Sequence, residues 1–156
     1  MTIAARVENY LREQGVSYEL VPHRASGSTH ESAVAAHVRD DHIAKAIIVR
    51  DARGDAMAVI PGDTWLQLDA LNRETGRDFQ LDEESEFGRL FADCVEGAVP
   101  PLGPAYGVET FLDEGLATLA NVYFEAGDHR HLVHVKGEDF LKLLPGVRHG
   151  LFGRAD

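Results

Sequence analysis

A lysine stands at the start of an apolar segment rich in β-branched residues. Residues 44–49 read AKAIIV, and such a run predicts an interior strand with Lys45 near its entrance. A lysine at this place either extends its ammonium into solvent or directs it into a site. In a site, the ammonium can bind a phosphate or ribose oxygen, or stabilise the negative charge that develops on an ester carbonyl.

A second segment, residues 97–103, combines glycine and proline in the order GAVPPLG. Its glycines, Gly97 and Gly103, permit backbone conformations that other residues rarely adopt, and its prolines stiffen the chain. Two backbone amides from such a loop can form an oxyanion hole for ester hydrolysis. The alternative is an ordinary rigid turn, which these residue types commonly make.

Three histidines lie close together near the end of the sequence, as His129-x-His131-x-x-His134. A metal site requires three convergent ligands, but an alternating strand would place His134 on the face opposite to the other two. We therefore expect no metal, and a substrate contact by His129 is the better interpretation. Asp128 can orient His129, bind the α-amino group of a substrate, or bond the backbone of its own turn.

Three further residues have simple structural alternatives to a functional role. His30 can line a pocket from the loop before a short helix, or it can be exposed. Cys94 has the acidic neighbours Asp93 and Glu96, which disfavour a reactive thiolate. We expect Trp65 to pack in the core with the leucines that follow it, rather than to form a base-stacking surface.

The composition sets limits on the class of protein. The 156 residues fit one domain, 1–156, and the formal net charge of −11 argues against DNA binding and against tight, non-specific RNA binding. Weak contact with one RNA end stays open. The single cysteine excludes an internal disulfide and agrees with a reducing compartment, so we expect a cytoplasmic protein. No apolar stretch approaches the length needed to cross a bilayer, and we expect no membrane partner.

Hydrophobic periodicity predicts interspersed helices and strands. The expected helices span residues 2–14, 29–37, 66–76, 83–91 and 138–144. The expected strands span residues 16–21, 42–49, 56–60, 80–81, 108–112, 119–125 and 131–135. Hairpins among these strands make the sheet mixed, so the fold class is α/β, of the α+β type, with one curved sheet. Residues 148–156 are expected to be a tail, with Leu151 and Phe152 available for contacts.

The order of these segments resembles the YbaK / prolyl-tRNA synthetase-associated editing-domain family. The similarity rests on YELVPH at residues 18–23, on AKAIIV at residues 44–49, on the Gly-x-x-x-Pro-Leu-Gly loop at residues 97–103 and on YFEAGDH at residues 123–129. It extends roughly from residue 2 to residue 144. The order and the spacing of the segments together carry the resemblance.

Members of that family hydrolyse amino acids from mischarged tRNA, either as free-standing proteins or as domains inserted in a synthetase. The resemblance implies a trans-acting aminoacyl-tRNA deacylase with a mixed, barrel-like sheet surrounded by helices. The implied substrate is a small amino acid, such as alanine or cysteine, esterified to the 3′ end of a tRNA such as tRNA-Pro. No cofactor is implied, a synthetase is a second expected partner, and we expect a monomer or a weak homodimer.

The resemblance also assigns roles to individual positions. The family's functional lysine corresponds to Lys45, its substrate loop to residues 97–103, and its late glycine-containing turn to Gly127 and the residues after it. This sequence departs from many members of the family at residues 128–131, which are unusually polar, and at Leu102, where phenylalanine is common. These departures affect the identity of the accepted amino acid more than the reaction type. With His30 added, the predicted catalytic residues are Lys45, Gly97 and Gly103, and the predicted substrate-binding residues are His30, Val99, Pro101, Leu102, Gly127, Asp128 and His129.

Two other functions stay open. The same pocket can recognise an amino acid or aminoacyl ester without turnover, in a binding module that docks on a synthetase, and the acidic surface suits a protein partner. A metal-dependent hydrolase would use the region of the three late histidines.

Overall fold

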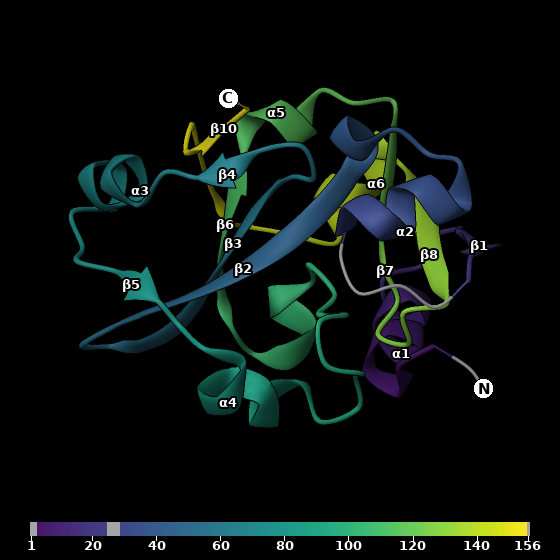
Figure 1. Ribbon diagram of the computed structural model, residues 1–156, viewed down its shortest axis with the longest axis horizontal. Helices are drawn as coiled ribbons and strands as arrows, with labels where there is room; N and C mark the ends of the chain where they lie inside the picture. The colour runs from purple at the N-terminus through teal and green to yellow at the C-terminus, as the bar shows by residue number, and fades with distance from the viewer. Residues whose placement is uncertain (1–2, 25–28, 156) are drawn as a thin grey trace.

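The computed structural model describes residues 3–24 and 29–155, and it contains a mixed eight-stranded sheet. The strand order is β1-β8-β7-β2-β3-β6-β9, and β5 pairs with the far end of β2 (Figure 1). Parallel and antiparallel pairs are both present, which confirms the predicted mixed sheet. The strands are β1 (Glu19–Pro22), β2 (Ile43–Asp51), β3 (Gly54–Pro61), β5 (Gln80–Leu81), β6 (Glu109–Asp113), β7 (Asn121–Glu125), β8 (His131–Lys136) and β9 (Arg148–Gly150).

Six α-helices surround this sheet in the described part of the chain. They are α1 (Ala5–Glu13), α2 (Thr29–Ala36), α3 (Leu68–Thr75), α4 (Glu84–Phe87), α5 (Glu114–Ala117) and α6 (Gly137–Lys142). Short 3-10 turns are η1 (Asp40–His42), η2 (Gly88–Phe91) and η3 (Gly103–Tyr106). The first helix was expected from residue 2, which lies outside the described residues. No helix in the described ranges has the length and apolarity to span a membrane.

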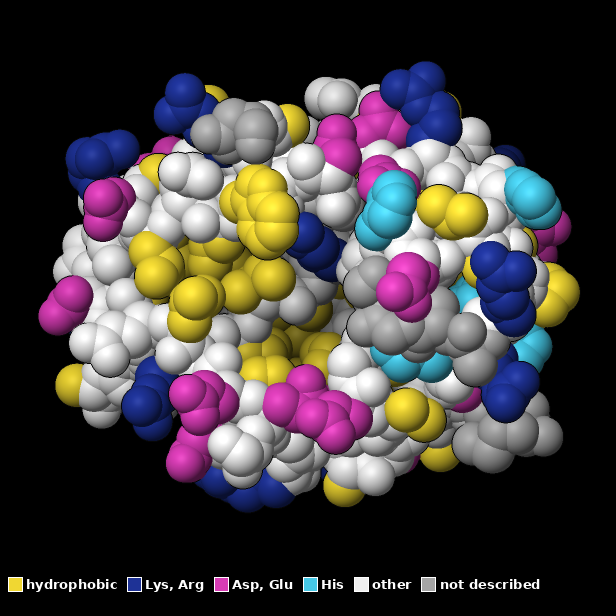
Figure 2. Space-filling view, in the orientation of Figure 1, with side chains coloured by type: hydrophobic (Ala, Val, Ile, Leu, Met, Phe, Trp, Pro, Cys, Tyr) yellow, Lys and Arg dark blue, Asp and Glu magenta, His cyan; other side chains and the backbone are white. Residues whose placement is uncertain are grey.

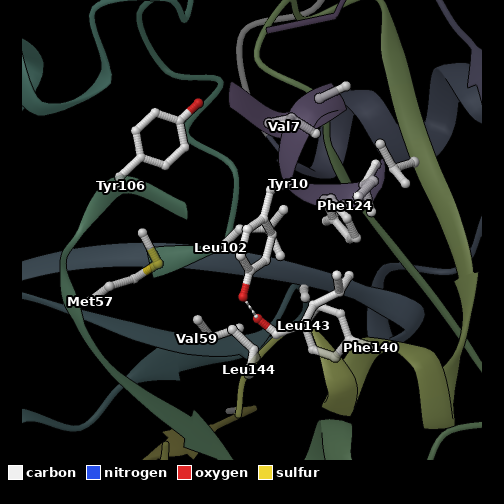
Figure 3. Packing of buried hydrophobic residues seen from close by; sticks show 14 of the residues in the cluster. Val7, Tyr10, Met57, Val59, Leu102, Tyr106, Phe124, Phe140, Leu143 and Leu144 are labelled. Atoms are coloured by element: carbon white, nitrogen blue, oxygen red, sulfur yellow. Dashed lines mark hydrogen bonds between the residues drawn. The ribbon is translucent and has the colours of Figure 1, made fainter. Parts of the chain in front are cut away.

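Strand β3 explains how one apolar run supports two layers of core. Successive side chains of a strand point to opposite faces. Met57 and Val59 therefore join the larger core cluster with α1 and α6, whereas Ala58 and Ile60 join a second cluster beneath α3. In the larger cluster the buried Tyr10 hydroxyl donates to the Leu143 carbonyl at 2.8 Å and ties α1 to the end of α6 (Figure 3).

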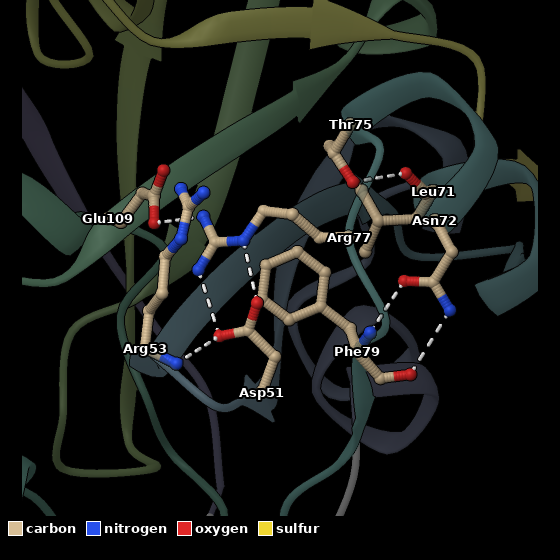
Figure 4. Close-up of polar contacts among 8 residues, drawn as sticks. All are labelled: Asp51, Arg53, Leu71, Asn72, Thr75, Arg77, Phe79 and Glu109. Carbon is tan, nitrogen blue, oxygen red and sulfur yellow. Dashed lines mark hydrogen bonds and ion pairs between the residues drawn. The ribbon is translucent and has the colours of Figure 1, made fainter.

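An ion-pair cluster joins the far end of β2 to β6. The Arg77 guanidinium binds the Asp51 carboxylate at 2.7 Å and the Glu109 carboxylate at 2.6 Å, and it lies over the Phe79 ring (Figure 4). Its hydrogen bonds to Asp51 lower the pKa of that carboxyl. The Asn72 side chain bonds both the amide and the carbonyl of Phe79, so the segment after α3 is held against this cluster.

The C-terminal residues differ from the expected tail. Residues 148–150 form β9 on the main sheet, and β10 (Gly153–Arg154) pairs with β4 (Trp65–Leu66) in a separate two-stranded ribbon. The Asp113 carboxylate accepts hydrogen bonds from the Phe152 and Gly153 amides, at 2.9 and 2.7 Å. Phe152 is consequently buried and unavailable for an external contact, whereas Leu151 is 69% exposed.

The expectation for Trp65 was wrong. Leu71 packs in the core as predicted, but Trp65 is 67% exposed. The reason is that β4 belongs to the small ribbon at the edge of the molecule, where only one face of the strand meets the core. The hydrophobicity of the side chain alone did not indicate this position.

Candidate functional site

The site lies at a gap beside strand β2. On one side, β2 pairs with β7 only through Ile43 and Ala44, and with β5 only through Val49 and Arg50. Within the described residues, no strand pairs with this side of β2 between those two stretches. The edge of Lys45, Ala46 and Ile47 is therefore open to other groups, and the opposite edge is covered by β3.

A pocket of about 160 Å³ occupies this gap. Lys45 from β2 and the loop residues Gly97 and Val99 line the same cavity, although about fifty positions separate them in the sequence. Figure 2 shows a hollow near the centre of this face, with hydrophobic side chains inside and acidic side chains along its lower margin. The full lining is Thr29, Ala44, Lys45, Ala46, Ile47, Glu84, Phe87, Gly97, Val99 and Glu125.

Lys45 is half-buried at the pocket. Its ammonium donates to the Gly62 carbonyl at 3.4 Å and lies 5.4 Å from the centre of the Trp65 ring. Burial lowers the pKa of Lys45, and the nearby carboxylates Asp63 and Asp40 act in the opposite direction. The side chain thus presents a positive group whose hydration shell is partly removed, which strengthens its interaction with a developing negative charge.

The loop meets the pocket at Gly97. This glycine has φ +84°, a conformation that disfavours other residues, and a side chain here would approach the His129 Nε2 atom to 3.1 Å. Its amide makes only a long contact, 3.5 Å, with the Glu84 carboxylate. The Ala98 amide, in contrast, donates to the Val95 carbonyl at 3.0 Å. The Gly97 amide is therefore a better donor for a ligand than the Ala98 amide.

A buried carboxylate forms one wall of the pocket. Glu125, at the end of β7, accepts a hydrogen bond from the Ser32 hydroxyl of α2 at 2.5 Å. Its other oxygen, Oε1, is buried and has no hydrogen-bond partner among residues 3–24 and 29–155; it lies 3.6 Å from His129 Nδ1 and 3.9 Å from His23 Nε2. The interaction with Glu125 raises the pKa of His129, against the effect of burial. The carboxylate therefore places negative charge in this wall of the pocket.

The turn after β7 places His129 but uses Asp128 internally. The Asp128 carboxylate accepts from the amides of Arg130 and His131 and from the His131 ring, at 2.7 to 3.0 Å. These donors lower its pKa against the effect of burial. Gly127, at φ +96°, lies against Ala4, where a side chain would be 2.7 Å from the Ala4 Cβ. Asp128 and Gly127 therefore shape the turn behind the pocket and do not line it.

Four further predicted site residues also lie outside the lining of the cavity. Leu102 is buried in the core (Figure 3), and Pro101 is buried beside it. Gly103 begins η3, and a side chain there would overlap the Thr110 hydroxyl and approach the Val108 carbonyl to 2.7 Å. His30 is exposed and pairs with the Asp40 carboxylate at 2.8 Å. In this structure, the buried residues Pro101, Leu102 and Gly103 anchor the loop in the protein interior and do not line the cavity.

The remaining chemistry-bearing residues do not converge. His131 bonds Asp128, whereas His134 bonds Glu19 and stacks on Tyr123. Among residues 3–24 and 29–155, no group of three metal-ligating side chains could hold a metal ion. Burial is the main cause that raises the pKa of the Cys94 thiol to about 12, which keeps the thiol protonated near neutral pH.

Sequence reasoning missed Glu125, Ser32 and Thr29. One signal was available, because Glu125 is a charged residue at the end of an apolar strand, just as Lys45 is a charged residue at the start of one. Such a residue is buried only where it has a partner or a site. Ser32 and Thr29 had no comparable signal, since they are small polar residues on a short helix.

Comparisons with known proteins identify the family and the fold of the chain. The aminoacyl-tRNA editing domain family matches residues 23–143. No curated protein matches the chain. Among solved structures, hypothetical protein APE2540 superposes with a TM-score of 0.83 at 23% identity, covering 96% of this chain and 99% of that one. A candidate trans-editing enzyme for prolyl-tRNA synthetase has a TM-score of 0.81 at 24% identity, covering 97% and 96%.

A third solved structure, a candidate signal transduction protein from Marinobacter aquaeolei VT8, has a TM-score of 0.80 at 20% identity. The match covers 97% of this chain and 31% of that protein. At these identities the three structures show a shared fold. The family match spans most of the chain, including both Lys45 and the Gly97 loop, and the chain therefore belongs to the aminoacyl-tRNA editing domain family.

Proposed function

We propose that the protein hydrolyses the ester between a small amino acid and the 3′-terminal ribose of a mischarged tRNA, acting in trans. The observation that carries this proposal is the shared cavity of Lys45 and Gly97, which puts a cation and a backbone donor beside one small space. The family match supports the editing reaction. The candidate trans-editing enzyme for prolyl-tRNA synthetase, similar over nearly its whole length, supports tRNA-Pro as the first substrate to test.

The size of the pocket supports a small amino acid. An engineered protein cavity of about 150 Å³ holds a molecule of the size of benzene. The cavity here, about 160 Å³, suits the few heavy atoms of an alanyl or cysteinyl group. A large aromatic side chain together with its α-amino group and carbonyl would exceed this volume.

The residues around the pocket suggest a division of roles. Water attacks the ester carbonyl, and the Gly97 amide and the Lys45 ammonium stabilise the negative charge on its oxygen. The Glu125 carboxylate binds the α-ammonium of the amino acid. The bond from the carbonyl carbon to the ribose oxygen then breaks, and that oxygen takes a proton. A neighbouring ribose hydroxyl moves the proton, so the reaction releases a free amino acid and an intact tRNA end.

A panel of mischarged tRNAs tests the proposal. We expect alanyl- and cysteinyl-tRNA-Pro to be hydrolysed faster than correctly charged prolyl-tRNA-Pro. Replacement of one oxyanion donor typically lowers a rate by about 10²- to 10³-fold, so Lys45→Ala should lose activity on that order. Lys142→Ala, on the exposed end of α6, is the matched control and should retain the wild-type rate. Equal rates for wild type and Lys45→Ala would remove Lys45 from the mechanism.

A further inference from the structure

Trp65 is the only tryptophan in the chain, and it is 67% exposed. Tryptophan combines a large apolar surface with a planar aromatic face, which suits it to stacking against a flat partner. The other exposed aromatic residue in the described ranges, Tyr18, is exposed to 38% and does not line the pocket. Trp65 is therefore the more exposed of these two aromatic side chains.

The backbone on both sides of Trp65 is fixed. Strand β4 pairs with β10, the Gln67 amide donates to the Phe152 carbonyl at 2.7 Å, and the buried Thr64 hydroxyl donates to the Pro61 carbonyl at 2.8 Å. The indole thus projects from a short rigid ribbon. A rigid aromatic platform binds a flat partner with little loss of conformational entropy.

The indole lies beside a side chain that lines the pocket. The Lys45 ammonium lies 5.4 Å from the centre of the Trp65 ring, and the same Lys45 lines the cavity of about 160 Å³. One lysine side chain therefore separates the indole from the pocket. Arg154 lies opposite Trp65 in the register of the β4–β10 ribbon and adds a second positive residue.

We propose that Trp65 is the stacking surface for the unpaired terminal nucleobase of the tRNA whose ester occupies the pocket. This inference rests on the proposed function. In the substrate, one ribose separates the base from the ester, and in the protein the Lys45 side chain both contacts the indole and lines the cavity. Stacking on an aromatic side chain does not require the positive surface that the chain, at a net charge of −11, lacks.

Intrinsic fluorescence tests the stacking directly, because every photon of tryptophan emission comes from Trp65. The probes are the trinucleotide CCA and the same trinucleotide with an abasic third position. We expect saturable quenching by CCA and a dissociation constant at least about fivefold weaker for the abasic probe, the lower limit for one stacked base. Equal quenching by both probes, or none by CCA, would overturn the inference. Emission that changes with protein concentration alone would instead assign the surface to self-association.

Kinetics with alanyl-tRNA give a second test. Trp65→Ala should raise KM by about 5- to 150-fold with kcat little changed, the range expected for one stacked base, and Trp65→Phe should restore most of the affinity. Tyr18→Ala is the control for removing an exposed aromatic and should leave KM unchanged. Unchanged KM in Trp65→Ala would reject the stacking while leaving the deacylase intact. Quenching by CCA without hydrolysis of any charged tRNA would reject the deacylase and keep the nucleobase site.

Discussion

Lys45 and Glu125 place opposite charges on the walls of one small pocket. Each belongs to a strand that is otherwise apolar, and the parallel pairing of β2 with β7 ends just before both of them. The carboxylate is the more deeply buried of the two, and one of its oxygens lacks a hydrogen-bond partner within the described part of the chain. A substrate with a negative centre and a positive centre a few atoms apart complements this pair, and an aminoacyl ester in its hydrolytic transition state has both.

The role of Glu125 predicts discrimination by the α-amino group. Wild type should hydrolyse alanyl-tRNA faster than N-acetyl-alanyl-tRNA, because acetylation removes the ammonium that Glu125 binds. Glu125→Gln should raise KM for alanyl-tRNA by about tenfold or more, the loss expected for a hydrogen bond to a charged group, and should reduce the preference for the free amine. The amide oxygen of glutamine can still accept the Ser32 hydrogen bond, so the fold should persist.

Glu84→Gln is the matched variant for this measurement, since Glu84 is the other carboxylate in the lining. It should keep the preference for the free amine. Comparable hydrolysis of the two substrates by wild type, or loss of the preference in Glu84→Gln alone, would contradict the assignment to Glu125.

At the scale of the elements, the two glycines of the 97–103 loop have different tasks. Gly97 reaches the pocket, whereas Gly103 lies buried against β6 at the start of η3. Gly97→Ala should cost about 1–2 kcal/mol for its left-handed backbone and should lower activity, because the new methyl group presses on His129. Gly103→Ala should cost about 3 kcal/mol by overpacking against Thr110.

Denaturant unfolding and single-turnover deacylation on the same two variants separate these effects. At a temperature where both variants are folded, Gly103→Ala should retain most of its activity and Gly97→Ala should not. The opposite order of activities would show that the loop meets the substrate at its other end.

An element could be predicted from the sequence when the residues that define it are close together in the chain. Helix α3 follows from the local spacing of its leucines, and it ends at Gly76 in a left-handed conformation, as its sequence indicates. Strands β4 and β10 are two residues each and pair across almost ninety positions, so no local alternation reveals them. The contact of Ser32 with Glu125 spans 93 positions and is equally invisible to local patterns. The pocket itself was anticipated in part, since Lys45 and Gly97 line the same cavity, whereas its acidic wall was not.

At the scale of the whole molecule, the net charge of −11 must be compatible with the proposed RNA substrate. Few phosphate contacts are available at the pocket, where Lys45 and Arg154 are the nearby cations and Asp40 and Asp63 offset them. When the logarithm of the binding constant is plotted against the logarithm of the salt concentration, each neutralised phosphate of a single strand steepens the negative slope by about 0.7. We therefore expect kcat/KM for alanyl-tRNA to fall by less than about tenfold between 50 and 200 mM salt.

Measurement of kcat/KM at several salt concentrations checks this expectation. A logarithmic slope of about −5 or steeper would indicate many phosphate contacts, and a binding surface far from the pocket would then have to be found.

The C-terminal ribbon has a practical consequence for anyone who handles this protein. Residues 153–154 pair with the strand that carries Trp65, so this two-stranded ribbon borders the proposed RNA entrance (Figure 1). An affinity tag or a fused protein attached there would crowd arriving acceptor stems, whereas one attached at the opposite terminus would project from beside α1.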